Sequence, residues 1–383
     1  MKSQIDNKST LIAIVLTFFS FQAFSFNKFD FNNDHLQDLF QLDTINKFVV
    51  ADLGNGDGTF MPSQNISLPV SATPKQILPI DLNLDGFDDL LVLGDDGSLV
   101  YLINDTLGGF GSEQVISTGL QLLESITDFV VVDFNGDSLL DVVLGINGLL
   151  NGRVVLFPAN GTDLDPSLTV QLGLLSSPSG IHFADINVDG HLDLLVEDGL
   201  GVMYRLLSDG MGDYNSPVSM LTGLPTGKLF MADTNGDQIP DVINLDKVLG
   251  ILTIRLGLGN SNFDTGLSIN TSGLLPSDAI VHDINLDGLS DILVVNTDSN
   301  SIDLFLGDAL LGLVASPINY LEDLLGQLPI LSGPIKIITG DFNSDCVQDY
   351  AIWNDITDDY VITLNQLGPD PNDLIFCSVF EEL

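Results

Sequence analysis

The stretch Asp133–Asp141, DFNGDSLLD, places acidic or amide side chains at its first, third, fifth and ninth positions. The same DxNxDxxxD pattern occurs seven times, with first aspartates at positions 30, 81, 133, 185, 233, 283 and 341. Self-similarity at a nearly constant period of this length is typical of repeat architectures. The residues of the pattern are Asp30, Asn32, Asp34 and Asp38; Asp81, Asn83, Asp85 and Asp89; Asp133, Asn135, Asp137 and Asp141; Asp185, Asn187, Asp189 and Asp193; Asp233, Asn235, Asp237 and Asp241; Asp283, Asn285, Asp287 and Asp291; and Asp341, Asn343, Asp345 and Asp349.

Short apolar runs surround each copy of the pattern. In the third unit they cover residues 129–132, 142–145, 154–157 and 168–172, and Gly, Asn, Asp and Pro separate them. Runs of this length that are rich in Val, Ile, Leu and Phe indicate strands. Four antiparallel strands repeated seven times predict an all-β fold, a seven-bladed β-propeller, because radial repetition leaves only short strand edges exposed. The approximate blades are 26–74, 75–126, 127–178, 179–226, 227–275, 276–333 and 334–383.

The repeated loop has the ligands of a calcium site. Oxygens at positions 1, 3, 5 and 9, with the backbone carbonyl of position 7, are hard ligands in the number that calcium prefers. Three carboxylates about 5 Å apart repel one another by roughly 3 kcal/mol per pair at an effective dielectric constant near 20, so seven such loops need a cation. A single copy would be read as an Asx turn with solvated acids. Seven copies in register favour up to seven bound Ca²⁺ ions.

Glycine is distributed unevenly over these loops. Position 6, where a sharp turn favours glycine, holds Gly86, Gly190 and Gly288 in the even copies, whereas Gly136 and Gly236 stand at position 4 of the third and fifth copies. The first and seventh loops have glycine at neither position. They are therefore the two loops least expected to hold an ion.

Together with residues 53–60, LGNGDGTF, the seven loops resemble the FG-GAP and VCBS repeats of bacterial secreted proteins. The fold of those repeats is similar to the seven-bladed propeller at the N-terminus of integrin α chains. The resemblance covers residues 26–383, and it implies that each loop joins the first and second strands of a blade and carries one calcium ion. The chain departs from the family in the missing glycines and in the lack of a spare N-terminal strand, since the processed chain would open with the first strand of blade one. Degenerate relatives of the hairpin occur at residues 108–110, 209–210 and 257–263.

Residues 1–25 predict a secretory signal peptide. Lys2 and Lys8 precede the apolar run 11–19, and Ala23 and Ser25 supply the small residues before a cleavage site. The run is short for a membrane span. We therefore expect a secreted protein, extracellular or periplasmic, without a membrane span. In such an oxidising compartment the two cysteines, Cys346 and Cys377, favour a disulfide within the last blade, which could act as its clasp.

The charge is strongly one-sided: 53 Asp and Glu stand against 11 Lys and Arg, and the net charge is -42. Nucleic acid is excluded as a partner because its binding needs a basic face. The 45% hydrophobic content excludes a disordered acidic chain. Part of the acid belongs to the loops, and the remainder fits a solvent-facing extracellular surface.

The sequence contains no recognisable catalytic set, since GxSxG, HExxH and phosphate-binding glycine loops are all missing from it. His35, His182, His191 and His282 are scattered over three units and form no evident pair. We therefore expect no enzyme activity. The predicted function is a monomeric, non-catalytic binding or adhesion module for an extracellular protein or glycan.

Two alternatives stay open. One is a lectin-like propeller that binds carbohydrate. The other is a calcium-dependent polysaccharide-degrading enzyme, for which the basic residues Arg153, Arg205 and Arg255 are few and far apart. Binding is expected on the face opposite the calcium loops, where residues 94–98, 197–201, 296–301, 354–359 and the long connection 319–334 lie, with Tyr320, Trp353 and Tyr360 as candidate aromatic surface.

Overall fold

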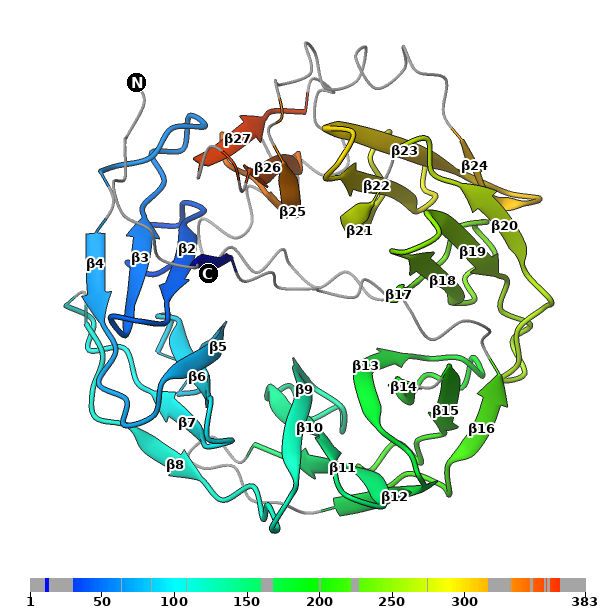
Figure 1. Ribbon diagram of the computed structural model, residues 1–383, viewed down its shortest axis with the longest axis horizontal. Helices are drawn as coiled ribbons and strands as arrows, with labels where there is room; N and C mark the ends of the chain where they lie inside the picture. Colours follow the sequence, from blue (N-terminus) through cyan, green and yellow to red (C-terminus); the bar gives the residue numbers. More distant parts are fainter. Residues whose placement is uncertain are drawn as a thin grey trace.

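The protein is a ring of seven antiparallel sheets, shown face-on in Figure 1. The computed structural model describes residues 11–13, 30–62, 64–83, 85–107, 109–159, 168–199, 201–221, 227–273, 275–315, 331, 333–344, 347–354, 356 and 359–365. The prediction of an all-β, seven-bladed propeller is confirmed. Six of the sheets have four strands, and the seventh has three within these ranges.

Each sheet uses its strands in the order in which they occur along the chain, so one hairpin follows another from the inside of the ring to its rim. The strands of blades one to four are β1 (Leu11–Ala13), β2 (Leu39–Asp43), β3 (Phe48–Asp52) and β4 (Gln64–Ser67); β5 (Pro74–Ile80), β6 (Asp89–Gly94), β7 (Leu99–Leu102) and β8 (Gln114–Ile116); β9 (Ser125–Val132), β10 (Asp141–Asn147), β11 (Asn151–Phe157) and β12 (Leu168–Leu174); and β13 (Pro178–Ala184), β14 (Asp193–Asp198), β15 (Val202–Leu206) and β16 (Val218–Leu221). Those of blades five to seven are β17 (Gly227–Ala232), β18 (Asp241–Asp246), β19 (Ile251–Arg255) and β20 (Leu267–Asn270); β21 (Pro276–His282), β22 (Asp291–Asn296), β23 (Ser301–Asp308) and β24 (Gly312–Ala315); and β25 (Pro334–Gly340), β26 (Asp349–Asn354) and β27 (Asp359–Thr363).

The first blade differs from the expectation. Its inner strand is β1, which pairs antiparallel with β2 between Leu11 and Asp43 and lies inside the segment predicted as a signal peptide. The strand expected just before Asp30 falls on residues 26–29, which are outside the described ranges. If the predicted leader is removed, β2 loses this partner.

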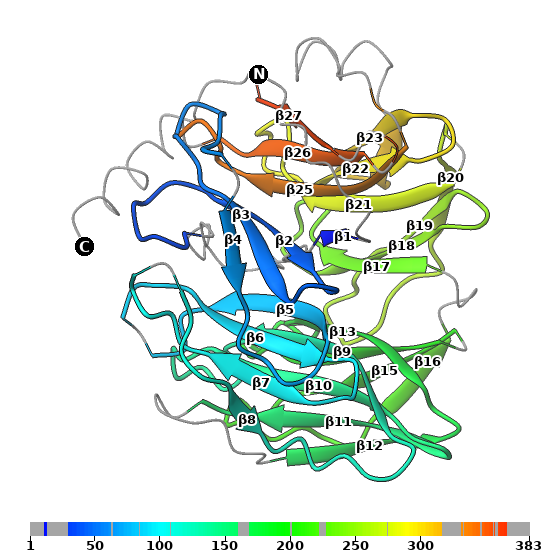
Figure 2. The ribbon, with the colours of Figure 1, turned by 60° about the vertical axis from the view of Figure 1, so that its left-hand side comes forward.

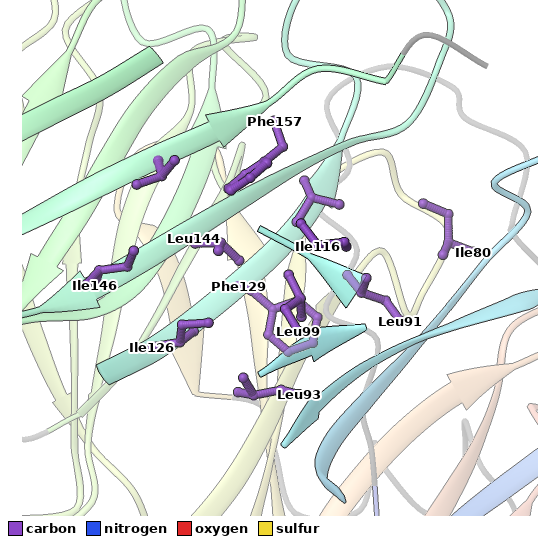
Figure 3. Close-up of a cluster of buried hydrophobic side chains, with 12 residues drawn as sticks. Ile80, Leu91, Leu93, Leu99, Ile116, Ile126, Phe129, Leu144, Ile146 and Phe157 are labelled. Atoms are coloured by element: carbon purple, nitrogen blue, oxygen red, sulfur yellow. The ribbon is translucent and has the colours of Figure 1, made fainter. Parts of the chain in front are cut away.

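The apolar core lies between the blades rather than inside any one of them. The second strands are buried on both faces, as in β6, where every residue is buried, because each sheet packs against two neighbours. Figure 3 shows the cluster between blades two and three, in which Leu91 and Leu99 meet Phe129, Leu144 and Phe157. Similar clusters occupy other blade interfaces, including that of blade seven with blade one, where Leu39 meets Phe342. Truncation of such a buried Leu to Ala costs about 2–5 kcal/mol, so these clusters hold the ring together.

The loops and turns are divided between the two faces of the ring. In blades two to seven the repeated aspartate pattern lies between the first and second strands, on the same face as the turns between the third and fourth strands. The turns between the second and third strands and the connections between blades lie on the opposite face. No helix long and apolar enough to cross a membrane occurs in the part of the chain that the structure describes.

Candidate functional site: the repeated aspartate loops

The loops share one network of hydrogen bonds, which blade four illustrates. The Asp185 carboxylate accepts hydrogen bonds from the backbone N–H groups of Asp189 (3.0 Å) and Gly190 (2.7 Å), and the Asn187 side-chain oxygen accepts a second bond from Asp189 N (2.9 Å). Asp189 in turn accepts from His191 N (3.0 Å). The corresponding bonds occur in loops one, two, three, five and six. Asp345 of the seventh loop lies outside the described residues.

The ninth aspartate has a different role, which is the same in all seven blades. In blade four, Asp193 accepts from Ile186 N at the start of its loop (3.2 Å) and from Ser208 N in the hairpin after the third strand (2.9 Å). The carboxylate is fully buried. It therefore joins the loop to the hairpin beside it. The other six ninth residues make the same pair of bonds: Asp38, Asp89, Asp141, Asp241, Asp291 and Asp349.

The hairpins that donate these bonds include the one predicted from residues 53–60. Isolated bridges join Gly54 to Phe60, Asn104 to Phe110, Ser208 to Tyr214 and Gly257 to Phe263. The first member of each pair donates its N–H to the ninth aspartate of its blade. The degenerate copies expected from the sequence are therefore present.

Burial and repulsion act together on the ninth carboxylates. Burial foremost, with a contribution from the nearby Asp137 and Asp133, raises the pKa of Asp141 to about 6, although N–H groups of Ala159 and Phe134 oppose the rise. Burial and the two other acids of its loop likewise raise the pKa of Asp38 to about 7. A cation placed among the acids of a loop would relieve this repulsion.

The donor set suits a hard cation, because carboxylate, amide and carbonyl oxygens are what calcium prefers. Within the described ranges, however, no three His, Cys, Asp or Glu side chains are grouped closely enough to hold a metal ion. The first and fifth carboxylates accept hydrogen bonds from amides of their own loop instead. Calcium binding at the residues of the pattern stays a prediction.

Among the described residues, the others singled out from the sequence do not gather into a site. His35 lies in loop one, His191 beside Gly210, and His282 at the end of β21, where burial lowers its pKa to about 4. His182 contacts Glu197, with 2.8 Å between Nε2 and Oε1. Trp353 is buried. Cys346, Cys377, Tyr320 and the side chain of Tyr360 lie outside the described residues, so the disulfide stays a prediction.

Two surface features were missed by the sequence analysis, and both lie toward the face opposite the aspartate loops. The leucine patch comprises Leu122, Leu123, Leu149, Leu150, Leu174 and Leu175, all between 59% and 92% exposed. The lysine cluster comprises Lys228, Lys247 and Lys336 around Asp278. Paired leucines outside the predicted strands were a visible signal for the patch, whereas the lysines come from blades five and seven and share no sequence pattern.

A ring of seven sheets in which repeated aspartate loops face one side defines a β-propeller built from related units. Comparison with protein families identifies these units: the chain contains FG-GAP-like repeats, matched at residues 30–92, 81–144 and 133–196. A comparison with curated proteins found no match.

Solved structures share the fold. A lectin of Agrocybe aegerita that recognises non-reducing terminal N-acetylglucosamine is 16% identical, with a TM-score of 0.57 over 81% of this chain and 79% of that one. BBS1N, solved in complex with ARL6DN, is 13% identical, with a TM-score of 0.56 over 87% of this chain and 88% of that one. A putative 6-phosphogluconolactonase of Bacteroides fragilis is 15% identical, with a TM-score of 0.51 over 73% of this chain and 79% of that one. At such low identity the likeness extends to the fold alone.

Proposed function

We propose that this protein is a secreted, calcium-stabilised propeller that acts as a non-catalytic binding module for an extracellular protein. The leucine patch is the observation that supports this proposal. Its residues belong to the connection before blade three, to the turn between β10 and β11, and to the end of β12 with the connection that follows it. Large contiguous apolar patches on the surface of soluble proteins mark interaction sites.

Backbone and side-chain contacts hold the patch together. Leu175 N donates to Leu150 O (2.6 Å), and Leu174 pairs with Asn151 on β11. Arg153 of the same strand binds Glu124, next to Leu123, with 2.8 Å between Nη2 and Oε2. The six leucines therefore sit on a fixed frame at one end of blade three, and the charged pair beside them is already neutralised.

The chemistry of the patch favours a protein over a glycan or a membrane. Sugar rings stack on aromatic side chains, and the exposed large apolar residues in the described part of the chain include no Phe, Tyr or Trp. A net charge of -42 repels anionic lipid headgroups. An apolar protein surface is the remaining complement.

Calcium has a structural part in this proposal. The first, third, fifth and ninth residues of each loop would hold the ion, with the seventh carbonyl. Calcium would offset two of the three carboxylate charges in each loop and fix the loop face. It takes no part in binding the partner, because the leucine patch lies on the other face.

The test is adhesion of beads that carry the purified protein to intact cell surfaces in the presence of calcium. We expect the double variant Leu149→Ser/Leu174→Ser to lose most of the adhesion. Leu107→Ser/Met211→Ser, which alters two similarly exposed apolar residues of the loop face, should retain it.

Treatment of the target surface then separates the candidates. Protease should abolish adhesion and periodate, which destroys glycans, should not. The opposite result would replace the proposal with carbohydrate binding. Sedimentation of the purified protein as a dimer that the leucine double variant dissolves would instead identify the patch as a contact between copies.

A further inference from the structure

The inner strands of six blades carry one equivalent residue each at the inner edge of the ring. Each lies five positions before the first aspartate of its loop and pairs with the residue four places after the ninth, as Lys228 pairs with Leu245. These strands are the first of their sheets and face the axis in Figure 1. The six residues are Gln76, Asp128, Gly180, Lys228, Asp278 and Lys336.

Blades five to seven make this edge positive over one arc. Lys228 Nζ donates to Asp278 Oδ1 (2.6 Å) and to Ala279 O (3.2 Å). The other oxygen, Asp278 Oδ2, accepts from Ile337 N of blade seven (3.2 Å), so the residue next to Lys336 is held against this carboxylate. Lys247 adds a third ammonium group from the turn after β18.

Two of the three ammonium groups make no direct contact with a carboxylate within the described ranges. There, neither Lys247 nor Lys336 has a hydrogen-bond or ion-pair partner, because the Asp278 carboxylate binds Lys228 and Ile337 N. Both side chains are half-buried, and burial foremost lowers the pKa of each, with Lys228 adding to the effect and Asp278 opposing it. Partly buried charges are rarely kept unless something pairs with them. The cluster thus sets three positive charges against one negative charge in a protein whose net charge is -42.

We propose that the lysine cluster binds a small carboxylate ligand at the inner edge of blades five to seven. A dicarboxylate, or a sugar acid that presents one carboxylate, would bridge Lys247 and Lys336 and complete the charge balance. A long polyanion does not fit. Salt limits the attraction of the lysines to about 8 Å, and the parts of the polymer beyond that distance would be repelled by the acidic remainder of the surface. Each ammonium group acts as a separate point charge, so a carboxylate ligand can place different oxygens against different lysines.

The experiment is calorimetric titration of the full-length protein with malonate and with glucuronate at constant ionic strength. Chloride serves as the non-bridging reference and glucose as the uncharged one. Lys336→Gln and Lys247→Gln are each expected to weaken binding about tenfold, since each removes one charge-assisted contact. Lys75→Gln is the matched control: it makes the same charge change on an exposed residue at the start of β5.

Thermal melting distinguishes a binding role from a structural one. Without ligand, Lys336→Gln should melt at or above the wild-type temperature, because it removes an unpaired, half-buried charge. Lys336→Arg should keep both charge and binding. Binding of malonate alone supports the proposal with a small organic acid as ligand, and binding of glucuronate alone supports it with a sugar acid.

The proposal is overturned if neither ligand gives saturable binding, or if both glutamine variants bind as tightly as the Lys75→Gln control. The lysine cluster and the leucine patch lie on different blades, so each can fail while the other holds.

Discussion

Two residues have a left-handed backbone in each of loops one, three, four, five and six. Position 6 has a φ of 67° at His35, 90° at Gly190 and 65° at Gln238, and position 4 has a φ of 60° at Val188 and 59° at Leu286. Glycine alternates between positions 4 and 6 because both positions require a positive φ. None of these loops has glycine at both positions, so each keeps some strain.

Val188 is the most strained of these residues, because β-branched side chains rarely adopt positive φ. We expect Val188→Gly to raise the free energy of unfolding by about 0.5–1 kcal/mol, after allowance for the greater freedom of glycine in the unfolded chain. Its side chain is exposed, so little packing is lost. Denaturant unfolding in calcium-containing buffer measures the change.

Two alanine variants are the controls for this change. Val188→Ala removes the β-branch but keeps a Cβ atom at positive φ, so it should gain less than Val188→Gly, and Gly190→Ala in the same loop should lose about 1 kcal/mol because it places a Cβ atom at positive φ. Equal stability of the glycine and alanine variants at position 188 would show that the loop is not strained.

The sequence predicted which residues form the loops but not where the ninth aspartate goes. Asp141 accepts a hydrogen bond from Ala159 N and Asp193 accepts one from Ser208 N, 18 and 15 residues later, and the donor hairpins differ in sequence and length. The donor is a backbone N–H, which almost every residue carries, so the side-chain sequence does not reveal which residue donates. Only the fold brings it to the carboxylate.

At the scale of the element, contacts between inner strands link neighbouring blades. Asp128 of β9 accepts a hydrogen bond from Ile181 N of β13 (2.9 Å), as Asp278 does from Ile337 N. Each bond satisfies an N–H at a strand edge that has no further strand to pair with. These aspartates take the place of a strand along the inner edge.

The link through Asp128 should depend on pH. Burial foremost raises the pKa of Asp128 to about 6, with His182 opposing and Glu197 adding to the rise. Because the folded value exceeds the ordinary value of about 3.9, this group stabilises the fold fully below about pH 4 and loses that contribution as the pH rises through about 6.

Asp128→Asn keeps an oxygen for Ile181 N and removes the charge. It should therefore be more stable than the wild type at neutral pH, by about 1 kcal/mol, and equal to it near pH 4. Thermal melts across this range check the expectation, with the exposed Asp298→Asn as the control for charge alone. A variant that is less stable at neutral pH would show that the charged form is needed beside His182.

Most strands were predictable because apolar runs and turn residues alternate at short range. The third unit was expected at residues 129–132, 142–145, 154–157 and 168–172, and β9, β10, β11 and β12 contain all four runs. The lysine cluster was not predictable, because Lys228, Asp278 and Lys336 come together only when three blades pack. The inner strand of blade one was also missed, since residues 11–13 read as part of a leader.

At the scale of the whole molecule, seven aspartate loops concentrate negative charge on one face. Repulsion among these charges opposes folding, and the apolar packing between the blades must outweigh it. If each predicted calcium site is occupied at a tenfold excess over its dissociation constant, each contributes about 1.4 kcal/mol, and seven contribute about 10 kcal/mol. For a protein of this size, that corresponds to roughly 10 °C in melting temperature.

We therefore expect EDTA to lower the melting temperature by about 10 °C. Calcium should restore it and equimolar magnesium should not, because magnesium demands a tighter octahedral site. Asp137→Ala, which removes a ligand from one of the seven loops, should reduce the calcium-dependent shift by about a seventh. A melt that EDTA leaves unchanged would mean that the loops are held by their own amide hydrogen bonds.

The consecutive order of strands in every sheet also bears on how the protein folds. Each blade is assembled from hairpins that are local in sequence, so blades can form one after another as the chain emerges, each on the exposed side of the last. Among the described residues, the final junction joins distant parts of the chain: Gly58 N donates to Phe342 O (2.8 Å), and the ring centroids of Phe60 and Phe342 lie 5.9 Å apart, edge to face. The blades can therefore fold in sequence, whereas closure of the ring between blades one and seven requires nearly the whole chain.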